Sequence, residues 1–93
     1  MEKRRPALVI SPDRRNASAN DVIVIPTSTT LRRMRWHVLL QRGEAGLPAA
    51  SVVKCEAVLT IPKELVDPEE LGVLSAARMG EVEAALLSAL GID

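Results

Sequence analysis

The chain has 93 residues, 47% of them hydrophobic, which argues against disorder and predicts a single small domain over residues 1–93. Its formal net charge is zero, yet residues 1–43 hold nine of the twelve Lys and Arg residues and residues 44–93 hold nine of the twelve Asp and Glu residues. An Arg-rich half suits phosphate recognition, because guanidinium is planar and always charged, although ordinary surface charge arranged in blocks would give the same counts.

Two short strands are predicted in the first third of the chain. Ala7–Ser11 is aliphatic and follows Pro6, which suits the first position of a strand, and Val22–Ile25 is a continuous apolar run typical of a buried strand. Residues 12–21 between them are predicted to form a loop. If the strands pair antiparallel, the guanidinium groups before the first strand meet the hydroxyls after the second. We therefore predict a phosphate site at this rim of the sheet.

The rest of the chain alternates short strands and turns and ends in a helix. Residues 36–41 alternate as a strand does, and residues 51–54 and 57–61 read as two strands or one bent strand. Residues 67–70 indicate a short helix or turn. Ser75–Leu90 is a predicted helix whose apolar stripe needs a sheet or a second subunit to cover it. The pattern predicts an α+β fold, a small antiparallel β-barrel with a C-terminal helix.

Several blocks of this sequence resemble the MazF/PemK toxin family, in order, from Arg5 to Gly91. The resemblance implies an SH3-like barrel of the CcdB/PemK type, here truncated at the N-terminus. The family's usual first strand and its Gly-containing loop have no counterpart before Arg5, so we expect an exposed sheet edge and a homodimer that covers it. The blocks are Arg-Pro-Ala-Leu-Val-Ile-Ser (5–11), Val-Ile-Val-Ile-Pro-Thr-Ser-Thr (22–29), His-Val-Leu-Leu (37–40), Gly-Leu-Pro (46–48), Ser-Val-Val-Lys-Cys-Glu-Ala-Val-Leu-Thr-Ile (51–61) and the terminal helix.

The resemblance also implies an activity. Members of the family are toxins of type II toxin–antitoxin systems that cut single-stranded RNA at short sequences without a metal ion. They leave a 2′,3′-cyclic phosphate and a 5′-hydroxyl. The expected partners are RNA (mRNA, with tRNA and rRNA as further candidates) and a cognate antitoxin laid over the active groove. Together with the single cysteine and the absence of long apolar runs, this predicts a cytoplasmic protein that does not associate with membranes.

Two residues fall on the family's catalytic positions. Arg5 matches the Arg of its Arg-Pro pair, and Thr27 matches the Thr that ends its second strand. We expect Arg5 to stabilise the phosphorane and to act as a candidate general acid, and Thr27 to position the phosphate, although such a Thr more often bonds to a nearby turn. The general base is unassigned. Histidine is the residue type whose ordinary pKa lies nearest neutrality, but His37 is interpreted as structural.

Further RNA contacts are predicted from charge and position, and no metal or other cofactor is expected. One His and one Cys cannot make a usual zinc site, and a single aromatic residue disfavours modules of the RRM and OB types. Glu56 is equally consistent with an RNA contact and with a solvated bulge. The predicted RNA-binding residues are Arg4, Arg14, Arg15, Ser28, Arg32, Arg33, Arg35, Trp36 and Glu56.

Two rival functions stay open at this point. One is a non-enzymatic CcdB-like toxin that binds a gyrase-type protein target through the terminal helix. The other is an inactive, truncated interaction module. Only the endoribonuclease hypothesis predicts site-specific cuts in RNA.

Overall fold

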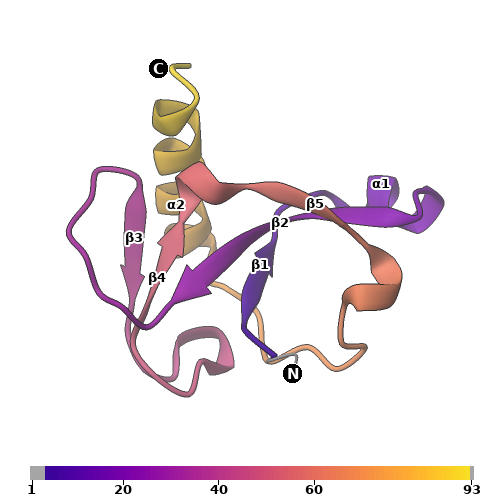
Figure 1. The fold of residues 1–93 in the computed structure, drawn as a ribbon, viewed down its shortest axis with the longest axis horizontal. Coiled ribbons are helices and arrows are strands. Elements are labelled where there is room, and N and C mark those ends of the chain that lie inside the picture. Colours follow the sequence, from indigo (N-terminus) through magenta and orange to yellow (C-terminus); the bar gives the residue numbers. More distant parts are fainter. Residues whose placement is uncertain (1–3, 93) are drawn as a thin grey trace.

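The computed structural model describes residues 4–92, which form five strands, two α-helices and three short 3-10 turns (Figure 1). No helix in this part of the chain combines the length and the apolar character that crossing a bilayer requires. In chain order the elements are β1 (Ala7–Val9), α1 (Asp13–Ser18), β2 (Asp21–Ser28), β3 (His37–Leu40), η1 (Glu44–Gly46), β4 (Ser51–Lys54), η2 (Cys55–Ala57), β5 (Leu59–Pro62), η3 (Lys63–Leu65) and α2 (Ala76–Ala89).

Strand β2 is the centre of an antiparallel sheet with the order β1-β2-β4-β3. β1 pairs with one side of β2, as predicted, and β4 and β5 share the other side. β5 pairs with its first half, from Asp21 to Val24, and β4 pairs with its last two residues. The turn η2 joins β4 to β5, so of the two predicted alternatives the structure has two strands, separated at Cys55–Ala57.

The pairing path ends at β1 and β3, and no pairing between these two strands closes it in the described residues. The sheet is therefore strongly curved but open. The predicted fold class, a small antiparallel sheet with a C-terminal helix, is confirmed, with this difference from a closed barrel.

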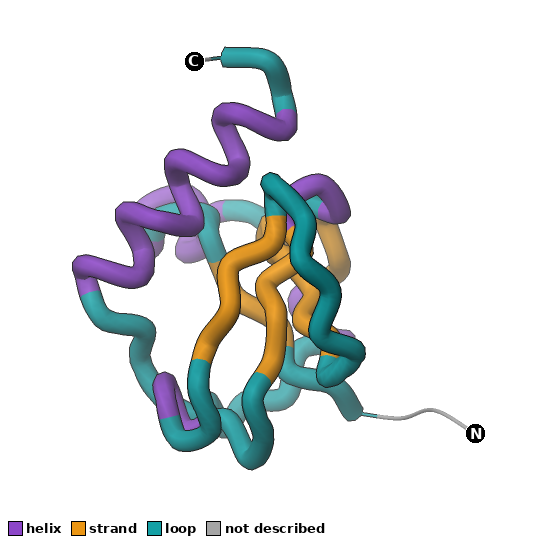
Figure 2. The backbone as a smooth tube through the Cα atoms, turned by 90° about the vertical axis from the view of Figure 1, so that its left-hand side faces the viewer, coloured by secondary structure: helices purple, strands orange, loops and turns teal. Residues whose placement is uncertain are grey.

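The core lies between the curved sheet and α2, which runs along one side of the strands (Figure 2). Ile25, Val53, Cys55 and Val82 are fully buried. α2 packs against β3 and η2, and Leu86 lies against the same cluster. Burial raises the pKa of the Cys55 thiol to about 11, with the nearby Glu56 carboxylate as a second cause, so this thiol stays protonated near neutral pH.

The predicted helix is confirmed almost to its bounds. Ser75 is its N-cap, and the Ser75 hydroxyl accepts a hydrogen bond from the backbone N–H of Arg78. The predicted apolar stripe is only partly covered, because Val82 is buried while Leu90 is 57% exposed. The helix is thus anchored along its first three turns, and its last turn extends beyond the sheet.

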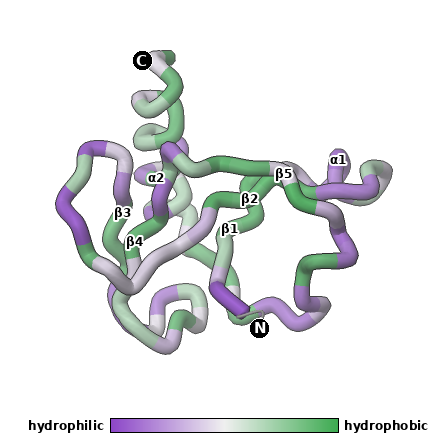
Figure 3. Tube along the Cα trace, viewed as in Figure 1, coloured by the Kyte–Doolittle hydropathy of each residue, from purple (hydrophilic) through white to green (hydrophobic). Residues whose placement is uncertain are grey.

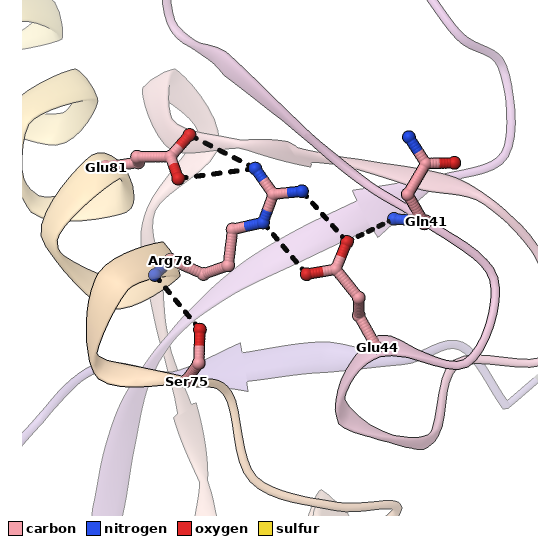
Figure 4. Close-up of polar contacts among 5 residues, drawn as sticks. All are labelled: Gln41, Glu44, Ser75, Arg78 and Glu81. Carbon is pink, nitrogen blue, oxygen red and sulfur yellow. Dashed lines mark hydrogen bonds and ion pairs between the residues drawn. The ribbon is translucent and has the colours of Figure 1, made fainter.

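The guanidinium of Arg78 ties α2 to the connection after β3 (Figure 4). Its Nε and Nη2 donate to the two carboxylate oxygens of Glu44, at 2.8 and 3.0 Å, and its Nη1 donates to Glu81 at 3.3 Å. Glu44 in turn accepts from the backbone N–H of Gln41 at 2.6 Å. One guanidinium therefore links the helix to the loop that carries η1.

That loop also crosses the segment leading into α2 at very close range. A Cβ built on Gly46 would lie 2.2 Å from the carbonyl oxygen of Leu71, and one built on Gly72 would lie 2.6 Å from the carbonyl group of Ala45. Gly46 also has φ +77°, a left-handed conformation that favours glycine. The two backbones touch because neither glycine carries a side chain.

The prediction of a loop over residues 12–21 was wrong, because Asp13–Ser18 forms the short helix α1. The carbonyl of Pro12 accepts from the N–H groups of Arg15 and Asn16, both at 3.0 Å. Ser11 and Asn16 exchange two hydrogen bonds: the Ser11 hydroxyl donates to Oδ1 of Asn16 at 2.6 Å, and Nδ2 of Asn16 donates to the Ser11 carbonyl at 2.9 Å. The helix is held by polar contacts, and such contacts leave no apolar periodicity in the sequence.

Candidate active site

The rim predicted from the sequence exists at the level of the backbone. Ala7 pairs with Pro26, and the hydroxyl of Thr27 donates a 2.8 Å hydrogen bond to the carbonyl of Pro6. Thr27 is thus bonded to the residue next to Arg5. Arg5 is exposed to solvent, whereas Thr27 is half-buried. The two predicted catalytic residues lie on neighbouring chain segments.

The strand pairings assign the neighbouring side chains to two faces of the sheet. Ser28 pairs with Val52, and Val52 pairs with Leu39 on β3, so these three point to the same side. Thr27 belongs to the alternate row with Val53 and Val38, which faces the core. Ser28 therefore opens onto the sheet's outer face.

A basic groove lies on this outer face, beneath the connection from β2 to β3. It is a hollow of about 590 Å³ that brings together three of the predicted RNA contacts. Figure 3 shows that hydrophilic and hydrophobic segments alternate along this connection. The residues that line the basic groove are Leu31, Arg32, Arg33, Met34, Arg35, His37, Leu39 and Val52.

His37 lines the basic groove and forms an ion pair or hydrogen bond with Glu56. Its Nε2 lies 3.1 Å from Oε2 of Glu56, and the His37 side chain is only 5% exposed. Burial raises the pKa of the Glu56 carboxyl, but the bond from His37 and nearby positive charge outweigh it, so the net pKa is below the ordinary value. An ionised Glu56 accepts only, which makes Nε2 the protonated nitrogen. The other ring nitrogen, Nδ1, is buried without a partner.

Lys54, which sequence reasoning missed, pairs with His37 across β3 and β4 and so lies on the same face. The signal for it was the strand alternation that puts Val52 and Lys54 on the face opposite to that of Val53. Its detection required knowing which face of β4 carries the site.

The predicted RNA contacts that do not line the basic groove include Arg4, Arg14, Arg15 and Trp36. Arg14 and Arg15 lie on α1, before the start of β2, whereas Thr27 lies roughly 20 Å further along the strand. Arg15 also forms an ion pair with Asp21 at 2.6 Å. Arg4 contacts Asp67 at 2.7 Å, although its side chain is 90% exposed. Trp36 does not line the basic groove, and its indole nitrogen is buried without a partner.

Within residues 4–92 no three His, Cys, Asp or Glu side chains gather in a way that could hold a metal ion. The chemistry available at the rim comes from guanidinium, hydroxyl and backbone groups, with the His37–Glu56 pair on the same sheet.

Comparison with known proteins identifies the family that this sequence matches. Residues 1–90 match the family model described as PemK-like, MazF-like toxin of type II toxin–antitoxin systems. The chain is 37% identical to the endoribonuclease MazF6 of Mycobacterium tuberculosis strain ATCC 25618 / H37Rv, over 97% of this chain and 81% of that protein.

Solved structures give the same result. The M. tuberculosis toxin MazF-mt6 superposes with a TM-score of 0.88 at 28% identity, covering 96% of this chain and 88% of that one. A mycobacterial endoribonuclease in complex with its cognate antitoxin superposes with a TM-score of 0.83 at 27% identity, covering 96% and 82%. The chain belongs to the family of MazF-like endoribonuclease toxins of type II toxin–antitoxin systems.

Proposed function

We propose that this chain cuts single-stranded RNA at a short sequence, without a metal ion, at the rim that joins Arg5 and Thr27. The observation that carries the proposal is the hydrogen bond from the Thr27 hydroxyl to the Pro6 carbonyl, at 2.8 Å, which puts both residues on adjoining segments. The basic groove supports it, since it offers positive charge on the outer face of the sheet, onto which Ser28, the residue after Thr27, opens.

The proposed reaction is an internal transfer of the phosphoryl group. A ribose 2′-oxygen attacks the adjacent phosphorus, the bond from phosphorus to the 5′-oxygen breaks, and the products are a 2′,3′-cyclic phosphate and a 5′-hydroxyl. The 2′-hydroxyl loses a proton to a base, and the leaving 5′-oxygen gains one. Arg5 contributes charge to the pentacoordinate phosphorane, because guanidinium binds two phosphate oxygens at once. Arginine remains protonated at neutral pH, so Arg5 is not the base.

The strand on either side of the cut would follow the basic groove. Arg32, Arg33 and Arg35, which line the groove, would contact phosphates along it, and Ser28 opens onto the same outer face. Stacking on bases would fall to the guanidinium planes of these arginines and to the half-buried ring of Trp36. Glu56 would accept from a base edge at the end of this track.

The proposed ribonuclease function also implies the partners of this chain. The substrate is single-stranded RNA, mRNA first, and the regulator is a cognate antitoxin that covers the groove, as a solved relative in complex with its antitoxin suggests. We propose a homodimer in the cytoplasm, with the edge strands β1 and β3 as candidate contact surfaces.

The test is incubation of the pure protein with a long unstructured transcript in EDTA, followed by mapping of the ends. We expect cuts at a short recurring sequence, with 5′-hydroxyl ends that a kinase labels directly. Arg5→Ala and Thr27→Ala should each lower the cleavage rate at least 100-fold while the melting temperature stays within a few degrees. Thr60→Ala, an exposed threonine on β5, is the matched control.

Other outcomes point elsewhere. Full activity of both variants contradicts the assignment of the site. Absence of cutting by the wild-type protein fits both rivals, the inactive module and the CcdB-like toxin. For the CcdB-like toxin, the exposed side chains Leu87 and Leu90 at the end of α2 would form the binding surface for a protein target.

A further inference from the structure

The hydroxyl proton of Thr27 is already committed within the protein. A threonine hydroxyl has one proton to donate, and in Thr27 it goes to the carbonyl of Pro6 at 2.8 Å. If the same proton were donated to a phosphate, the bond to Pro6 would have to break. On the basis of the function proposed above, we infer that Thr27 is a positioning residue, which acts on the phosphate through Arg5 by holding the Pro6 carbonyl.

The chain around Arg5 needs such a restraint. The β1–β2 ladder begins at Ala7, so Arg5 lies outside it. Pro6 has no N–H, which leaves its carbonyl as the only backbone group through which it can hydrogen-bond. The Thr27 bond to that carbonyl extends the attachment of this segment to β2 by one residue beyond the ladder. It therefore fixes the backbone immediately next to Arg5.

Two further features limit the directions open to Arg5. The helical region is disfavoured for a residue before proline, which favours an extended backbone at Arg5. On its other side, Arg4 contacts Asp67 at 2.7 Å, an exposed pair that adds a weak second tether. Arg5 thus lies between a firm attachment at Pro6 and a weak one at Arg4. Loss of the firm attachment would let the guanidinium move by an ångström or more, enough to lower a rate by about 100-fold.

A direct and an indirect role of Thr27 differ in how its substitution combines with substitution of Arg5. If Thr27 contacts the phosphate itself, that contact remains when Arg5 is replaced, so Thr27→Val still lowers RNA affinity and cleavage rate in the Arg5→Ala background. If Thr27 acts by positioning Arg5, its hydroxyl has nothing left to do once the guanidinium is gone. The double-mutant cycle separates the two cases.

The experiment measures single-turnover cleavage and RNA affinity for the wild type, Thr27→Val, Arg5→Ala and the double variant. The affinity probe is a short single-stranded RNA with one 2′-deoxy nucleotide at the mapped cut, which keeps the measurement available when cleavage is too slow. Thr27→Val should lower kcat about 100-fold with a smaller change in KM, and Thr27→Ser should stay within about threefold of the wild type. In the Arg5→Ala background, Thr27→Val should change rate and affinity by less than twofold.

Thr60→Val is the matched threonine control, and thermal melting checks the fold of every variant. Losses that multiply in either measurement overturn the inference while leaving the proposed ribonuclease intact. Wild-type levels of activity in Thr27→Val also overturn it. A wild-type protein that cuts no RNA overturns the proposed function, and the inference with it.

Discussion

At the scale of single residues, the contact of Arg78 with Glu44 shows how much one guanidinium can organise. The pair is bidentate, and each side chain is somewhat less than one-third exposed. The bond from Arg78 is the main cause that holds the pKa of Glu44 below its ordinary value, followed by the bond from the Gln41 backbone. The same contact raises the pKa of Arg78.

This contact predicts an acid-sensitive contribution to stability. A carboxyl whose pKa is lowered by folding stabilises the native state fully above its unfolded pKa of 4.5, and this contribution is lost as the pH falls through the folded value. Glu44→Gln should therefore melt at a lower temperature than the wild type at pH 7. The difference should shrink steadily below about pH 4.5. Melting curves from pH 7 to pH 2 test this, and a difference that does not depend on pH would contradict it.

At the scale of elements, the crossing of η1 with the segment before α2 depends on two glycines. Gly46 and Gly72 lie 26 positions apart in the chain, yet each backbone fills the space that the other's Cβ would need. The crossing fixes where the chain enters α2, and the Arg78–Glu44 contact closes the same junction from the helix side.

Alanine at Gly72 is predicted to be destabilising and alanine at Gly80 stabilising. At Gly72 the new Cβ would meet the Ala45 carbonyl at 2.6 Å, an overlap that backbone must relieve at a cost of about 1–3 kcal/mol. Gly80 lies inside α2 with nothing within 4 Å, so Gly80→Ala should gain up to about 1 kcal/mol from helix propensity. Urea denaturation of both variants measures the contrast, and equal effects would contradict it.

The elements that sequence could predict are those with strong periodicity. β2 and α2 were predicted because Val22–Ile25 is a run of β-branched residues and because Ser75 precedes a helical stripe. α1 was missed since its stability comes from the Ser11–Asn16 hydrogen bonds and not from an apolar face. Propensity carries no information on such pairs.

At the scale of the whole molecule, the basic half of the sequence divides into two regions in space. Arg32, Arg33 and Arg35 gather at the basic groove, while Arg15 is engaged with Asp21 at the other end of β2. Charge counting along the chain could not separate them, because the separation depends on which end of a strand each loop joins. The Arg5–Thr27 rim could be anticipated, since antiparallel neighbours must bring those ends together.

This separation predicts which arginines set the salt dependence of RNA binding. Each phosphate contact in single-stranded RNA contributes about 0.7 to the slope of log affinity against log salt. Arg32→Ala/Arg33→Ala should lower that slope by about 1.4, whereas Lys63→Ala in η3, a loss of one charge away from the groove, should leave it unchanged. Titrations of a fluorescent RNA between low and moderate salt measure the slopes. An unchanged slope in the arginine variant would place the RNA elsewhere.

The position of β2 has a consequence for how the protein unfolds. This strand is bonded to β1, to β4 and to β5, and through β4 to β3, so every strand in the sheet is attached to it directly or through one neighbour. Once β2 detaches, β1 and β5 lose the strand with which they pair, and β4 keeps only β3. The strands of the sheet therefore depend on one shared partner, and heating should unfold the sheet in a single cooperative transition.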